Sequence, residues 1–176
     1  MTGRDFPNAV LVTERLVLLP WDAADIDLVA ELHGSKEVNR YLSGAGKAWA
    51  REDAVRAMEK WMGEHEALGI GKLKLVERSS GRFVGRAGFS PYGAPATFEL
   101  GFTIAPSFWG QGYATEIAKG LANWFFDTGK GARFIAFAHP DNAASLGVIA
   151  KLGMRRSGTV KVGAVDFLNF ERSADT

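Results

Sequence analysis

Apolar residues recur along this chain with two different periods, which divide it into strands and helices. The Val- and Leu-rich segment 10–19 ends at Pro20 and predicts a first strand. Asp22, with Asp25 three residues further on, has the pattern of a helix N-cap. Helical spacing follows it through Ile26, Val29 and Ala30, then at residues 36–42 and 51–67, with a loop expected at 44–46.

The middle of the chain contains three strand-like stretches, residues 72–77, 82–89 and 97–104. Short turns at 79–81 and 91–93 separate them. Because short turns join antiparallel strands, we expect hairpins or a meander here.

The second half of the chain returns to helices. A glycine-rich turn at 109–113 opens a helix, and residues 133–138 predict a short apolar strand. Asp141 is expected to begin another helix, and two final strands are predicted at 155–161 and 165–171. This order predicts an α/β (α+β) fold in which a mixed sheet carries helices on its faces.

Composition narrows the class of protein. The chain has 176 residues, 47% of them hydrophobic, which fits one domain over residues 1–176 with a proper core. A net charge of +1 argues against a nucleic-acid surface, which needs a concentrated basic face. The absence of cysteine excludes disulfides, thiolate nucleophiles and Cys-ligated metals. No apolar run is long enough for a signal peptide or a membrane span, so we expect a soluble, cytoplasmic protein without a membrane partner.

The glycine turn is the segment with the clearest chemistry. Gly110 and Gly112 lie between a predicted strand and a predicted helix, whose first turn has unpaired N–H groups and the positive end of the helix dipole. Glycines let a ligand approach the backbone, so a phosphate group has a binding site there. The P-loop and dinucleotide-binding patterns are both incomplete, which disfavours those functions. The alternative is that the two glycines only shape a tight turn.

Three segments of the chain resemble one known family. The acetyl-CoA-binding motif of the GNAT superfamily of N-acetyltransferases resembles residues 99–116, ELGFTIAPSFWGQGYATE. The next motif of its RimJ/RimL-like branch resembles residues 139–154, HPDNAASLGVIAKLGM, and the opening of that branch is similar to residues 12–26, VTERLVLLPWDAADI. The resemblance covers nearly the whole chain in the right order. It implies a mixed, mostly antiparallel, splayed central sheet of six or seven strands with helices on both faces.

The resemblance also implies acetyl-CoA as the co-substrate, without a metal, and assigns residues to it. Backbone N–H groups at the glycine turn would hold the pyrophosphate, and three strand residues would pair with the pantetheine amides through their backbone. Asn142 would touch the pantetheine arm, and Ser145 lies one helical turn later on the same face. The turn residues are Gly110, Gln111, Gly112, Tyr113 and Ala114, with a hydroxyl from Thr115, and the strand residues are Phe102, Thr103 and Ile104.

Two positions depart from the general family pattern. Trp109 stands where the family has Gln or Arg, and Trp there is usual for the RimJ/RimL-like branch. Ile149 aligns with a tyrosine that serves many members as the general acid. Because isoleucine has no proton to give, the proton for the departing CoA thiolate has to come from Ser145, a water or bulk solvent.

The candidate general base is Glu99. It shares a strand face with Gly101 and Thr103, so its carboxylate could face the cleft and accept the proton of the attacking amine. A hydrogen-bonded or solvated strand residue, or a base acting through water, is the alternative. His139 also precedes the site, but there we favour a hydrogen bond to the backbone.

The expected function is therefore transfer of an acetyl group from acetyl-CoA to a primary amine, which is either a small molecule or a protein N-terminus. A homodimer is a further expectation. Two hypotheses compete with this function. The first is a non-catalytic acyl-CoA-binding or regulatory domain, which Ile149 in place of tyrosine keeps open. The second is a nucleotide or dinucleotide binder that uses the glycine turn.

Overall fold

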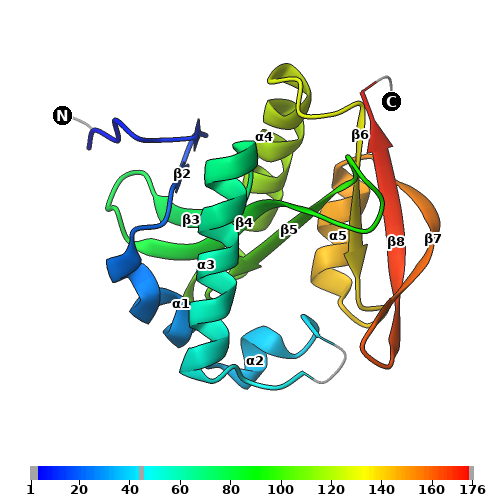
Figure 1. Ribbon diagram of the computed structural model, residues 1–176, viewed down its shortest axis with the longest axis horizontal. Helices are drawn as coiled ribbons and strands as arrows, with labels where there is room; N and C mark the ends of the chain where they lie inside the picture. Colours follow the sequence, from blue (N-terminus) through cyan, green and yellow to red (C-terminus); the bar gives the residue numbers. More distant parts are fainter. Residues whose placement is uncertain (1–3, 44–45, 175–176) are drawn as a thin grey trace.

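The computed structural model describes residues 4–43 and 46–174 (Figure 1). The N-terminal half contains, in chain order, β1 (Leu11–Val12), β2 (Leu16–Leu19), a 3₁₀ turn (Ala23–Asp25), α1 (Ile26–His33), α2 (Lys36–Asn39), α3 (Arg51–Leu68), β3 (Lys72–Glu77) and β4 (Phe83–Pro91). The C-terminal half contains β5 (Phe98–Ile104), a 3₁₀ turn (Pro106–Phe108), α4 (Tyr113–Asp127), β6 (Arg133–Ala138), α5 (Ala143–Lys151), β7 (Arg155–Val162) and β8 (Val165–Ser173). No helix in these two ranges is long and apolar enough to cross a lipid bilayer.

The strands form one mixed sheet in the order β1-β2-β3-β4-β5-β6-β8-β7. The neighbours are antiparallel except for β5 and β6, which are parallel. The mostly antiparallel, mixed sheet expected from the sequence is confirmed. It has eight strands in the described ranges, where six or seven were expected. The extra strand arises because residues 10–19 form two strands, joined by a turn that the Thr13 N–H closes by donating to the Leu16 carbonyl at 2.9 Å.

Strands β5 and β6 separate along their length. β5 pairs with β4 from Phe98 to Ile104, but its register with β6 in the described chain is one pair, Glu99 opposite Ile135. From Glu99 towards Ile104 the two strands diverge, and the sheet opens at its centre. This opening positions the candidate site.

Helices cover both faces of the sheet (Figure 1). On one face α1 and α3 bury a cluster that includes Trp21, Val29 and Trp61. On the other face α4 and α5 pack on the main core, in which Phe89, Phe125 and Phe134 are almost completely buried. Each fully buried aromatic or aliphatic side chain contributes about 1.5–3 kcal/mol, so these two layers hold the sheet in its twisted, open form.

Helix ends follow the sequence signals closely. Asp22 is an N-cap with a reciprocal capping box to Asp25, as its spacing predicted. Gly69 ends α3 in the left-handed conformation (φ 64°). Two predictions need correction. Helix α5 is capped by Asn142 and not by Asp141, because the Asn142 side chain accepts the Ser145 N–H. Helix α2 is only four residues long, shorter than the helical spacing at 36–42 predicted. Of the loop expected at 44–46, the first two residues lie outside the described ranges.

Candidate active site

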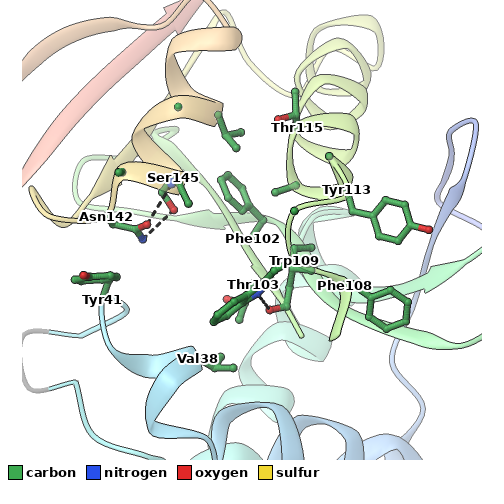
Figure 2. Close-up of a pocket in the computed structure, with 18 of the residues that line it drawn as sticks. Val38, Tyr41, Phe102, Thr103, Phe108, Trp109, Tyr113, Thr115, Asn142 and Ser145 are labelled. Carbon is green, nitrogen blue, oxygen red and sulfur yellow. Dashed lines mark hydrogen bonds between the residues drawn. The ribbon is translucent and has the colours of Figure 1, made fainter. Parts of the chain in front are cut away.

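A large cavity lies where the sheet opens, between the end of β5 and the first turns of α4 and α5 (Figure 2). Its volume is about 540 Å³, and it is lined mainly by backbone and apolar side chains. Val38 in α2, with Tyr41 and Leu42 after it, closes the remaining side. All the expected cofactor-binding residues except Gln111 are among its lining residues in the described chain.

The glycine turn has the geometry of an anion site. Gly110 and Gly112 have φ values of 72° and 79°, a left-handed conformation that favours glycine. The first N–H bonded within α4 is that of Glu116, which donates to the Gly112 carbonyl at 3.0 Å. The N–H groups of Tyr113, Ala114 and Thr115 precede it and have no intrahelical acceptor. Together with the positive end of the helix dipole, they attract a negatively charged group.

An acidic clamp holds this turn against the first hairpin. Glu116 accepts hydrogen bonds from the Thr13 hydroxyl at 2.6 Å and from the Arg15 N–H at 2.8 Å, and its carboxylate pairs with the Arg15 guanidinium at 2.7 Å. Arg15 in turn donates to the Gln111 carbonyl at 2.9 Å. Although burial alone would raise the pKa of Glu116, these hydrogen bonds lower it. Glu116 is therefore a structural anion, and Arg15, which pairs with it, ties the turn to the first hairpin.

Two aromatic residues fix the turn from either side. The Tyr113 side chain points away from the cavity (Figure 2), and its hydroxyl donates to Glu77 at 2.7 Å, so Tyr113 offers the site its backbone N–H. The hydrogen bond to Glu77 raises the pKa of Tyr113. The indole N–H of Trp109 donates to the Ile104 carbonyl at 2.7 Å. Trp109 thus ties the turn to β5 while its ring stays 46% exposed at the cavity rim.

The open edge of β5 presents alternate backbone groups. The Tyr92 N–H donates to Thr97 at 3.0 Å and the Ala105 N–H to Val84 at 2.8 Å, which sets the phase of the β4–β5 ladder. In an antiparallel ladder hydrogen-bonded pairs alternate, so Phe102 and Ile104 direct their backbone groups towards the opening and Thr103 directs its own towards β4. This differs from the sequence-based expectation that Thr103 pairs through its backbone. Thr103 offers instead its buried hydroxyl, which has no hydrogen-bond partner among the described residues.

Asn142 and Ser145 form a small polar unit at the start of α5 (Figure 2). The Asn142 carbonyl oxygen accepts the Ser145 N–H at 3.1 Å, and the Asn142 amide donates to the Ser145 hydroxyl at 3.0 Å. Since the Ser145 oxygen accepts this bond, its own proton is free to point elsewhere. The unit faces Phe102 across the cavity.

A second, smaller cavity of about 220 Å³ adjoins the first. Residues from α5, β5 and the segment after α2 line both cavities: Tyr41, Leu42, Phe102, Asn142 and Ser145. Ile149 lines the smaller cavity. A group held in one cavity therefore meets a group held in the other beside Phe102 and Ser145.

Glu99 lines the smaller cavity, but it is not alone there. Its carboxylate lies 2.5 Å from the ammonium of Lys72, which also donates to the carbonyls of Glu99 (3.0 Å) and Gly88 (3.2 Å). Burial lowers the pKa of Lys72, and Glu99 opposes that shift. Gly101 leaves room for the pair, because a Cβ there would lie 2.7 Å from the Lys72 nitrogen. Glu99 is therefore present in the site as one half of an ion pair and not as a free carboxylate.

Lys72 and Arg86 were not identified from the sequence as site residues. Arg86, on β4, lines the same cavity, and its Nε–H donates to His33 Nε2 at 3.0 Å. The only sequence signal was a charged residue within an otherwise apolar strand.

His139 lies outside both cavity linings in the described chain. Its Nδ1 accepts the Asp141 N–H at 3.1 Å, and its ring packs against Tyr41.

Comparisons with known proteins agree with this geometry. The family model of the acetyltransferase (GNAT) domain matches residues 15–155. An uncharacterized N-acetyltransferase of Bacillus subtilis, YnaD, is 28% identical over 151 residues, which cover 86% of this chain and 85% of that protein. A GNAT-family acetyltransferase structure from Bacillus anthracis superimposes with a TM-score of 0.80 at 25% identity, covering 94% of this chain and 99% of that one. A RimL ribosomal L7/L12 α-N-protein acetyltransferase solved with coenzyme A shares the fold (TM-score 0.78, 18% identity, 95% and 98% coverage).

The chain therefore belongs to the GNAT acetyltransferase family, and its open, mixed sheet is the fold of that family. It is an acetyl-CoA-dependent N-acetyltransferase. RimL- and RimJ-type ribosomal-protein acetyltransferases are among its structural neighbours.

Proposed function

We propose that the chain acts as one N-acetyltransferase domain in which acetyl-CoA occupies the larger cavity and the acceptor amine enters through the smaller one. The observation that carries this proposal is that the two cavities share Phe102, Asn142 and Ser145 at the point where β5 and β6 diverge. The acceptor is a primary amine, on a small molecule or at a protein N-terminus.

The larger cavity suits the chemistry of acetyl-CoA. The free N–H groups of Tyr113, Ala114 and Thr115 suit a pyrophosphate. The backbone groups of Phe102 and the Ile104 N–H suit the amides of a pantetheine arm that lies along β5. The Ile104 carbonyl already accepts the Trp109 indole N–H, which leaves it one lone pair for such a contact. Acetyl-CoA supplies an acetyl group activated as a thioester.

In the proposed reaction the neutral amine nitrogen forms a bond to the acetyl carbonyl carbon, and the carbon–sulfur bond breaks. Backbone N–H groups of β5 polarise the carbonyl oxygen. Glu99 takes the amine proton, directly or through a water, and the Ser145 hydroxyl passes a proton to the leaving sulfur. The proton on Glu99 returns through solvent to the Ser145 oxygen, which restores both residues. Holding both reactants at the junction of the cavities supplies much of the acceleration.

The test is titration of the purified chain with acetyl-CoA by calorimetry, followed by CoA thiol release over a panel of amines. We expect saturable binding and amine-dependent release. Glu99→Gln should lower kcat/KM more at neutral than at high pH, and an unchanged pH profile would remove Glu99 from the mechanism. Acetyl-CoA binding without thiol release for any amine would favour the non-catalytic alternative, and no binding at all would refute the proposal.

A further inference from the structure

Among the described residues, three charged side chains reach the smaller cavity, all from neighbouring strands of the sheet. They are Lys72 on β3, Arg86 on β4 and Glu99 on β5. Two are cations and one is an anion, so the cavity carries an excess positive charge. Their hydrogen bonds show which of the two cations makes no ion pair.

Lys72 is fully satisfied. An ammonium has three N–H donors, and those of Lys72 reach the Glu99 carboxylate, the Glu99 carbonyl and the Gly88 carbonyl. Its charge and that of Glu99 cancel as an ion pair. Glu64 also attracts Lys72 through space but accepts none of its three N–H groups; it accepts the Ser90 hydroxyl at 2.9 Å and lies 3.6 Å from Lys60.

Arg86 makes no ion pair of its own among the described residues, and the carboxylate that attracts it, Glu99, is already paired with Lys72. Arg86 is only 8% exposed, and its guanidinium stacks 4.8 Å above the Trp61 ring. Its hydrogen-bond partner His33 is neutral, since His33 Nε2 accepts the Arg86 proton and burial lowers the pKa of His33 to about 3. In the described part of the chain the other four guanidinium N–H groups have no hydrogen-bond partner. A buried cation that shares its nearest carboxylate with another cation is costly, and an anionic ligand that pairs with it directly gains free energy.

We propose that the acceptor is a small amine that also carries an anionic oxygen group, a carboxylate or a phosphate, and that Arg86 binds this group while the amine faces Ser145 and Phe102. This inference rests on the proposed function and names its substrate class. The planar fork of guanidinium matches both oxyanions. A cavity of about 220 Å³ is smaller than the usual ligand pocket of about 300–1,000 Å³, which suits a small amine.

The experiment compares matched acceptors with the full chain. Thiol release is measured for L-amino acids against their C-terminal amides, and for O-phosphoethanolamine against ethanolamine. We expect the charged member of at least one pair to have a kcat/KM about 10- to 100-fold higher, because a site built for a polar group rejects the analogue that lacks it. The pair that shows the preference identifies the anionic group.

Variants assign the preference to Arg86. Arg86→Gln should bring the ratio of kcat/KM between the charged and the neutral acceptor close to one, mainly by raising KM of the charged acceptor. Arg86→Lys should restore part of the preference. Arg56→Gln is the matched control, because Arg56 lies exposed on α3 and pairs with Asp53. An acetyl-CoA-induced rise in Tm equal to that of the wild type checks that Arg86→Gln is folded. If it is not folded, Arg86→Lys carries the comparison.

The outcomes separate the two proposals. Failure of the wild type to bind acetyl-CoA would refute the proposed function. Thiol release that is equal for charged and neutral acceptors, or a preference that survives in Arg86→Gln, would overturn only the inference about Arg86. The inference also fails if the wild type binds acetyl-CoA but no charged acceptor causes either release or a CoA-dependent rise in Tm.

Discussion

The ion pair of Lys72 and Glu99 offers a quantitative test of how this site is built. The two side chains are 7% and 14% exposed, and their charged atoms lie 2.5 Å apart. Removing one partner of a buried pair leaves an uncompensated charge and costs about 3–5 kcal/mol. Because Glu99 keeps some contact with the cavity, we expect Lys72→Met to lower the free energy of unfolding by about 2–4 kcal/mol.

The double variant Lys72→Met/Glu99→Gln removes both charges. It should be more stable than the sum of the single variants implies, with a coupling energy of about 2–3 kcal/mol. The assay is urea unfolding of the wild type, both single variants and the double variant at pH 7 and one salt concentration. The exposed pair Lys161 and Asp166, 3.2 Å apart, provides the control cycle, and it should give a coupling of less than about 1 kcal/mol.

A coupling energy below about 0.5 kcal/mol for the buried pair would refute the reasoning. It would mean that water in the cavity screens Glu99 as fully as it screens a surface carboxylate. Glu99 would then be a stronger candidate for an unassisted base.

Three further predictions concern the residues around the site. Because the pKa of His33 is lowered to about 3, the unfolded chain binds a proton below pH 6.5 that the folded protein excludes, so stability falls as the pH falls from 6.5 towards 3. Urea unfolding should show a loss of about 2 kcal/mol between pH 7 and 5 that His33→Gln abolishes. Gly112→Ala, at φ 79°, should cost about 1–2 kcal/mol in thermal unfolding, and Gly112→Asn, which tolerates that conformation, should cost less. Trp109→Phe removes the 2.7 Å bond to Ile104, and it should cost about 1 kcal/mol or less in stability but raise KM for acetyl-CoA severalfold.

Local signals in the sequence predicted most of the elements. Caps, glycine stops and apolar periods act within a few residues, so they are visible without knowledge of the fold. Asp22 behaves as its position indicated. The segment 10–19 was predicted wrongly as one strand, because the polar residues of its turn interrupt the apolar pattern only briefly.

The site was predictable only where a motif is continuous in the chain. The glycine turn and the Asn142–Ser145 unit each lie within one short segment. Lys72 and Glu99 are 27 residues apart, and their meeting depends on the register of three strands, which no local pattern encodes. The same is true of Arg86 and His33, which are 53 residues apart.

The single point of register between β5 and β6 has a consequence for the lifetime of the folded molecule. Apart from that point, the two halves of the sheet are held together by side chains that pack across both, such as Phe89, Phe125 and Phe134, and by any ligand that contacts both. A ligand seated on both sides at one hundred times its Kd adds about 2.7 kcal/mol to stability, a sizeable part of the total for a domain of this length. The lifetime of the folded enzyme should therefore increase with the concentration of acetyl-CoA.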